Sequence, residues 1–134
     1  MTDLPPDEER RDRPHEAAGW FDLPPGARVW IGGHDTALKK RLHRLLAGFS
    51  RPSEGPLHAA FLTPKDEEEA AYFARKLRPR LAPRGRLWIL RPRGDGHGPA
   101  GEKLTDLLAR AGYRPCDSPD LPLPAHACGF TPAP

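Results

Sequence analysis

The chain has 134 residues, a formal net charge of +3, 18 prolines and two cysteines. This length predicts one domain that buries roughly two thirds of the surface of its unfolded chain, so folding needs neither metal nor disulfides. The sequence contains no apolar run as long as a membrane span, and its polar N-terminus is unlike a signal peptide. Together with the low cysteine content, these features predict a cytoplasmic protein with no membrane partner.

The charge is distributed unevenly along the chain. Residues 1–22 hold seven acids and three arginines, a balance of −4, which leaves +7 for residues 23–134. Residues 1–19 lack apolar periodicity, and we expect a disordered acidic tail there, followed by a single α/β domain over residues 20–134. The apolar run Trp20–Leu23 is predicted to anchor the tail at the edge of the domain, with a lid over a pocket as the alternative.

The first predicted strand and helix lie between residues 28 and 47. Arg28–Ile31 is a β-prone run that ends at a glycine pair, which predicts a strand with a tight exit. Asp35 is well placed as the N-cap of a helix that runs through Ala47, with Gly48 ending it.

The second strand and helix follow the same scheme. His58–Thr63 reads as a buried strand, and the acids of Asp66–Glu69 open a helix at the positive end of its dipole. We interpret this acidic run as helix-start electrostatics rather than as a metal or catalytic cluster. Apolar residues at helical spacing predict a face packed on a sheet: Ala70, Phe73, Ala74 and Leu77.

A third strand and helix, and two extended segments, complete the chain. The chain is predicted to turn at Ala82–Gly85, to form a strand over Leu87–Leu90, and to continue into a polar loop. A third helix ends near Gly112, and extended segments are predicted at 113–118 and 125–130. Strand–helix alternation predicts parallel pairing in a three-layer α/β sandwich, with the last two strands forming an antiparallel hairpin at one edge.

The second half of the chain carries a recognisable pattern. Residues 77–89 read Leu-x-Pro-x-Leu-x-Pro-x-Gly-x-Leu-Trp-Ile, and residues 104–113 read Leu-x-x-Leu-Leu-x-x-Ala-Gly-Tyr. Over residues 58–131 this resembles the C-terminal half of class I S-adenosylmethionine-dependent methyltransferases. The resemblance implies a truncated Rossmann-like, five-stranded, mostly parallel sheet of order 1-2-3-5-4 whose last strand is antiparallel, with ligands outside the carboxyl ends of the strands.

Two features that the family needs for its cofactor are missing, and so is a catalytic motif of the family. The loop Trp30–Asp35 has two adjacent glycines and no preceding acid, where the family has an acid and several spaced glycines. Residues 47–58 are too few for the further strand whose terminal carboxylate binds the ribose, and no Asn/Asp-Pro-Pro-Tyr motif occurs. The chain therefore more closely resembles a small bacterial family of uncharacterised proteins that keeps the topology without the cofactor motif. The resemblance to that family rests on Pro25-Gly26 and, loosely, on Leu90–Arg93.

Candidate ligand contacts follow from where parallel strands end. The glycine pair and His34 precede a helix N-terminus that can receive an anion, although Asp35 as N-cap competes for those donors. The polar loop after the third strand offers arginines for a phosphate or carboxylate, with an exposed hydrophilic loop as the alternative. The candidate ligand-binding residues are Gly32, Gly33, His34, Arg91, Arg93, Asp95 and His97. Cys116, His126 and Cys128 lack zinc-ligand spacing, so no metal is expected, and no catalytic residue is identified.

The sequence favours a non-catalytic, methyltransferase-like domain that acts as a binding or regulatory module for a protein partner or a polyanion. It leaves enzymatic activity open while favouring its absence, and we expect no cofactor. One alternative is an active S-adenosylmethionine-dependent methyltransferase. The other is a protein that binds nucleic acid or another polyanion through Lys39, Lys40, Arg41, Arg44, Arg75, Lys76, Arg78 and Arg80.

Overall fold

The computed structural model describes residues 19–92, 101–116 and 125–133, so residues 1–18 of the predicted tail lie outside it. Five strands form one sheet in the order β1-β2-β3-β5-β4. They are β1 Val29–Gly33, β2 Leu57–Thr63, β3 Leu81–Pro92, β4 Tyr113–Pro115 and β5 Ala125–Pro132. The strands β1, β2 and β3 pair in parallel, whereas β5 is antiparallel to both β3 and β4. The predicted sheet order and the antiparallel last strand are confirmed.

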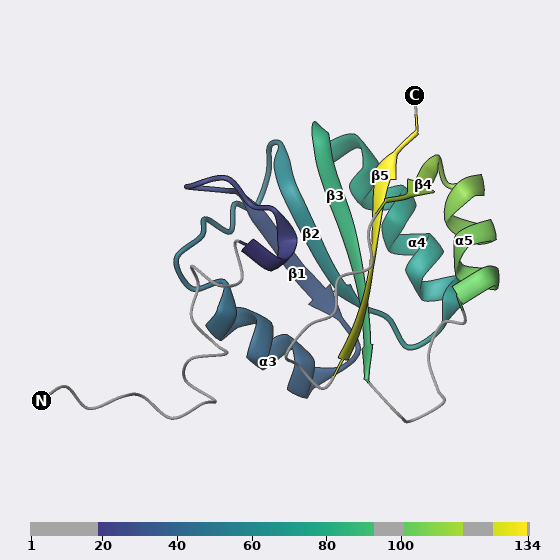
Figure 1. The fold of residues 1–134 in the computed structure, drawn as a ribbon, viewed down its shortest axis with the longest axis horizontal. Helices are drawn as coiled ribbons and strands as arrows, with labels where there is room; N and C mark the ends of the chain where they lie inside the picture. Colours follow the sequence, from purple (N-terminus) through teal and green to yellow (C-terminus); the bar gives the residue numbers. More distant parts are fainter. Residues whose placement is uncertain (1–18, 93–100, 117–124, 134) are drawn as a thin grey trace, which may run out of the picture.

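Helices cover both faces of the sheet, as Figure 1 shows. The helix α3 (Thr36–Leu45) packs on one face, where its leucines join a core cluster with Phe61 and Trp88. The helices α4 (Glu67–Leu77) and α5 (Gly101–Arg110) pack on the other face around Leu87 and Ile89. The predicted three-layer α/β sandwich is confirmed.

Side-chain caps begin the first two of these helices where the sequence predicts. The Leu38 N–H donates to the Asp35 carboxylate at 2.9 Å, and the Glu69 N–H donates to the Asp66 carboxylate at 2.8 Å. The helix α3 ends at Leu45, two residues before the predicted Ala47. The cap residue Leu46 donates its N–H back to Leu42, and the chain turns away before Ala47 and Gly48.

The predicted turn at Ala82–Gly85 is wrong, because these residues belong to β3. A 3₁₀ turn at Arg78–Arg80 redirects the chain instead. The register pairs Leu57 with Leu81 and Ala59 with Arg86, so the extra residues of β3 form a bulge between these two points. Proline and glycine in this stretch therefore mark an irregular strand start rather than a chain reversal.

The segment before β1 lies in the core and not at the domain edge, where the sequence placed it. A helical turn at residues 19–21 lies across the sheet on the same side as α3 (Figure 1). The Phe21 side chain is 1% exposed, and its ring meets the rings of Phe61 at 4.8 Å and Trp88 at 5.1 Å, edge to face. Such pairs stabilise beyond their burial alone, so this segment is an integral part of the domain.

Contacts with α4 and the adjoining 3₁₀ turn hold the C-terminal hairpin. The Tyr113 hydroxyl donates to the Ala74 carbonyl at 2.7 Å, and burial raises the pKa of this phenol. The Arg78 guanidinium donates to the carbonyls of Gly112 and Ala133 at 3.0 and 2.9 Å. Within the described part of the chain, no helix is long and apolar enough to cross a membrane.

Candidate functional site

The glycine pair predicted to contact a ligand forms the last two residues of β1. Gly32 pairs with Leu62 and Gly33 with Thr63, so both lie in the sheet rather than in an exit turn. His34 follows them and is exposed. Only His34 and Asp35 separate the strand from α3.

Thr63, at the end of β2, clamps this short loop. Its side chain is buried, with 1% of the residue exposed. The Thr63 carbonyl accepts the His34 N–H at 2.6 Å, and its hydroxyl accepts the Asp35 N–H at 3.2 Å. The same hydroxyl lies 3.5 Å from the Gly32 carbonyl, to which it donates. The loop is thus hydrogen-bonded to the neighbouring strand.

The space that the two glycines leave is filled by the chain itself. Gly33 has φ 123°, and a Cβ there would lie 2.5 Å from the Thr63 carbonyl oxygen. A Cβ on Gly32 would overlap the Trp30 indole. The glycines therefore serve a close approach between β1 and β2 and room for an indole, rather than an open cradle.

The residues at the carboxyl ends of β1 and β2 do not fit an adenosyl cofactor of the kind that the methyltransferase resemblance implies. β1 is an edge strand, and α3 leads through residues 46–56 straight into β2, its direct neighbour. No strand beyond β1 is therefore available among the described residues to supply the ribose-binding carboxylate. The Asp35 carboxylate caps its own helix.

Of the remaining predicted site residues, the structure describes only Arg91. Arg91 is half-buried near the end of β3 and pairs with His126 of β5. Arg93, Asp95 and His97 lie outside the described residues. No group of three or more His, Cys, Asp or Glu residues that could hold a metal occurs in the part of the chain that the structure describes.

The basic side chains named for polyanion binding are spread over both faces of the sheet. Those of α3 lie on one face and those of α4 on the other. The Arg78 guanidinium binds the carbonyls of the C-terminal hairpin, and the Arg80 guanidinium donates to the carbonyls of Gly55 and Pro52 at 3.2 and 3.3 Å. The basic residues of α3 and those of α4 therefore do not share one face of the sheet.

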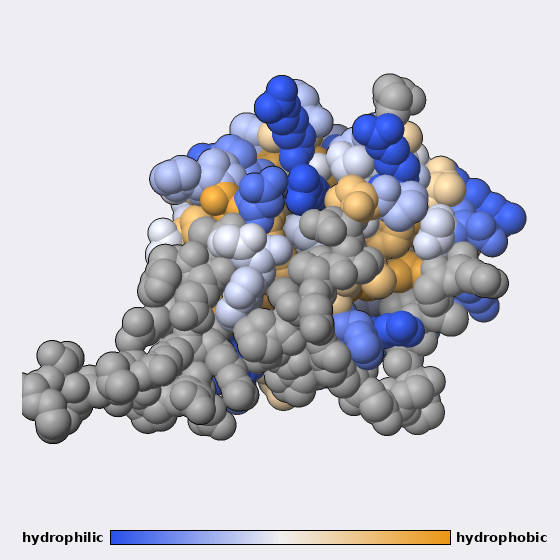
Figure 2. Space-filling view, in the orientation of Figure 1, coloured by the Kyte–Doolittle hydropathy of each residue, from blue (hydrophilic) through white to orange (hydrophobic). Residues whose placement is uncertain are grey.

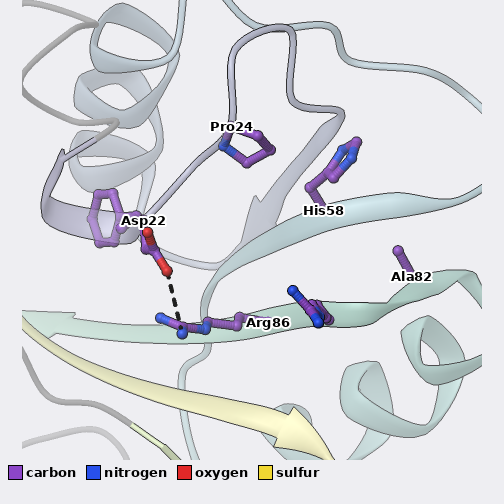
Figure 3. A pocket seen from close by; sticks show the side chains of 7 residues that line it. Asp22, Pro24, His58, Ala82 and Arg86 are labelled. Carbon is purple, nitrogen blue, oxygen red and sulfur yellow. Dashed lines mark ion pairs between the residues drawn. The ribbon is translucent and has the colours of Figure 1, made fainter.

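A hollow opens instead on the opposite side of the sheet, at the amino ends of β2 and β3 (Figure 3). Its volume is about 420 Å³. Hydrophilic side chains gather over this upper edge of the molecule in Figure 2. The segment before β1, the start of β2 and the bulged start of β3 supply the lining, which consists of Phe21, Asp22, Pro24, His58, Ala82, Arg84 and Arg86.

Hydrogen bonds and charges define the chemistry of this hollow. The Arg86 guanidinium lies 3.5 Å from the Asp22 carboxylate and 6.0 Å from the centre of the Trp88 ring. The Nδ1 of His58 accepts the Arg28 backbone N–H at 2.9 Å, so the neutral imidazole carries its proton on Nε2. Two guanidinium groups and one carboxylate leave the lining net positive.

Sequence reasoning missed these residues because they come from three separate segments. Arg84 falls within the predicted turn, Arg86 falls between that turn and the predicted strand, and His58 is the first residue of another predicted strand. One signal was available: strands that run parallel bring their amino ends to the same edge, so His58 and the arginines flanking Gly85 had to lie near one another.

No protein-family model and no curated protein sequence matches the chain. Solved structures do match. The chain has a methyltransferase-like α/β fold. It resembles mitomycin 7-O-methyltransferase MmcR with a TM-score of 0.60 and 13% identity, over 95% of this chain and 54% of that one.

Two further structures of this class are similar to the chain. The 1,6-didemethyltoxoflavin-N1-methyltransferase of Burkholderia thailandensis matches with a TM-score of 0.56 and 17% identity, over 96% of this chain and 80% of that one. A TehB-like SAM-dependent methyltransferase from Corynebacterium glutamicum matches with a TM-score of 0.55 and 13% identity, over 91% and 86%. The chain spans about half the length of the first matches (54 to 56%). At these identities the likeness establishes the fold alone.

Proposed function

We propose that the chain is a non-catalytic, methyltransferase-like domain that acts as a binding or regulatory module. In this proposal it is a degenerate form of the fold, which keeps the scaffold and, among the described residues, lacks the elements that hold a cofactor. The observation that carries this proposal is the Thr63 clamp, which joins the loop after Gly33 to the end of β2.

The clamp sets an energetic barrier to cofactor binding. A cofactor that reached the β1 backbone would have to break the bonds from the His34 and Asp35 N–H groups to Thr63. At about 1 kcal/mol for each bond, the opening costs about 2 kcal/mol, which weakens apparent affinity roughly 30-fold. The Trp30 indole beside Gly32 would also have to move. No ribose-binding carboxylate compensates for these costs within the described residues.

Isothermal titration of the full chain with S-adenosylmethionine and S-adenosylhomocysteine tests the proposal. We expect no saturable heat with either compound. Saturable binding in the micromolar range would refute the proposal.

Trp30→Ala is the matched variant for this titration, because it removes the indole from Gly32 and leaves the Thr63 clamp in place. It should also fail to bind. A gain of binding in Trp30→Ala would show that the indole, rather than the clamp, excludes the cofactor.

A further inference from the structure

We infer that the hollow at the amino ends of β2 and β3 binds a small organic anion, namely a phosphate or carboxylate group carried on an apolar body. The site lies at the amino ends of the strands, whereas this fold class is expected to hold its ligands at the carboxyl ends. The inference deepens the proposed function, on which it rests, by naming a ligand class and a place for it.

The floor of the hollow supplies the anion-binding groups. Arg84 and Arg86 both belong to the bulged start of β3, and both line the hollow. Figure 3 shows Arg86 facing the Asp22 carboxylate. The Arg86 side chain is only 30% exposed, and its guanidinium lies over the Trp88 ring. A partly desolvated, oriented guanidinium is well suited to a planar carboxylate or to two phosphate oxygens.

Asp22 marks the position of the ligand's anionic group. Its carboxylate points at Arg86 in Figure 3, but its side chain is 81% exposed and 3.5 Å separates the charged atoms. An exposed pair of this kind contributes little to stability. Asp22 also has φ 53°, a left-handed backbone conformation that is uncommon outside glycine. An incoming anion can therefore replace this carboxylate at Arg86 at small cost.

The other walls explain why the ligand should be larger than a bare ion. Pro24 and Ala82 provide apolar surface beside the buried Phe21 ring, and the Nε2–H of His58 adds one neutral donor. The volume of about 420 Å³ lies within the range of sites that enclose small organic molecules. Apolar walls with a few placed charges are the usual composition of such sites.

Titration of the full chain with phenyl phosphate, benzoate and inorganic phosphate, at low ionic strength, tests the inference. We expect saturable binding of phenyl phosphate or benzoate, with the tighter of the two identifying the anionic group, and weaker binding of inorganic phosphate. Equal affinity for inorganic phosphate would overturn the claim for an apolar body. No binding by any of the three compounds at millimolar concentration would overturn the whole inference and leave the proposed function intact, because that is judged by S-adenosylmethionine.

Variants of opposite sign separate a built site from general charge attraction. Arg86→Gln should weaken binding about tenfold, whereas Asp22→Asn should tighten it several-fold by removing the competing carboxylate. Glu68→Gln and Arg75→Gln make the same charge changes on exposed positions of α4, on the other face of the sheet, and should each change affinity less than about twofold. Equal effects in the two pairs would refute the inference. If Arg86→Gln does not fold, the exposed Arg84→Gln takes its place and should also weaken binding.

Discussion

Replacing Gly33 by alanine tests whether the glycines at the end of β1 serve the sheet or a ligand. Gly33 has φ 123°, and an added Cβ would lie 2.5 Å from the Thr63 carbonyl oxygen and 2.6 Å from its amide nitrogen. These are backbone atoms of a buried strand, so they cannot swing aside as the end of a flexible side chain can. Gly33→Ala should therefore distort the loop and loosen the clamp.

The expected loss can be worked out from the contacts. Backbone strain at such a φ costs about 1–3 kcal/mol, and the two bonds from His34 and Asp35 to Thr63 contribute about 1 kcal/mol each. We expect Gly33→Ala to lower the free energy of unfolding by about 3 kcal/mol. With a urea m-value of about 1.5 kcal/mol/M, the unfolding midpoint should fall by about 2 M.

Gly32→Ala is the matched control in the same urea unfolding assay. The three atoms nearest to its Cβ all belong to the half-buried Trp30 side chain, so Trp30→Ala should relieve most of the effect of Gly32→Ala and none of the effect of Gly33→Ala. A Gly33→Ala midpoint within about 0.3 M of the wild-type value would contradict the reasoning, because the glycine would then be available for a ligand.

Two further predictions concern the core segment before β1 and the response to acid. Phe21→Ala should lower the free energy of unfolding by about 3–5 kcal/mol, because it removes a ring that contacts Phe61 and Trp88 in the core; a loss below about 1 kcal/mol in urea unfolding would show that the segment is peripheral. Partial burial, and then the charges of Arg51 and Lys39, lower the pKa of His43 from 6.5. As the pH falls, the unfolded chain therefore takes up a proton at this position before the folded chain does, and the free energy of unfolding should decrease below pH 6.5. His43→Gln should reduce this loss, and an unchanged slope of unfolding free energy against pH would contradict the assignment.

The order of elements was predictable because each element is encoded locally. The continuous apolar run of β2 and the capped, periodic α4 can each be recognised within a dozen residues, and strand–helix alternation then leaves few topologies. Phe21 shows where this reasoning stops. An aromatic pair after an acidic tail indicates an anchor, but nothing local tells whether the anchor reaches the edge or the centre of the sheet.

The candidate sites were harder to predict because both depend on register rather than on pattern. A glycine pair beside a helix start looks the same whether it faces a ligand or a neighbouring strand, and the pairing of Gly33 with Thr63 decides between the two. The sequence predicts Thr63 as the last residue of a buried strand. Its hydroxyl can bond the loop after β1 only because β1 ends beside it.

The hollow at the amino ends of β2 and β3 also results from strand register. Between the pairs Leu57–Leu81 and Ala59–Arg86, β3 is longer than β2, and the excess bulges out. Gly85 holds this bulge in place, because a Cβ there would lie 2.9 Å from the carbonyl oxygens of Ala82 and Leu57. A tightly matched register at the carboxyl ends of β1 and β2 thus joins the loop after β1 to Thr63 of the neighbouring strand. A mismatched register at the amino end of β2 and β3 places two arginines around a hollow that a straight strand would not leave.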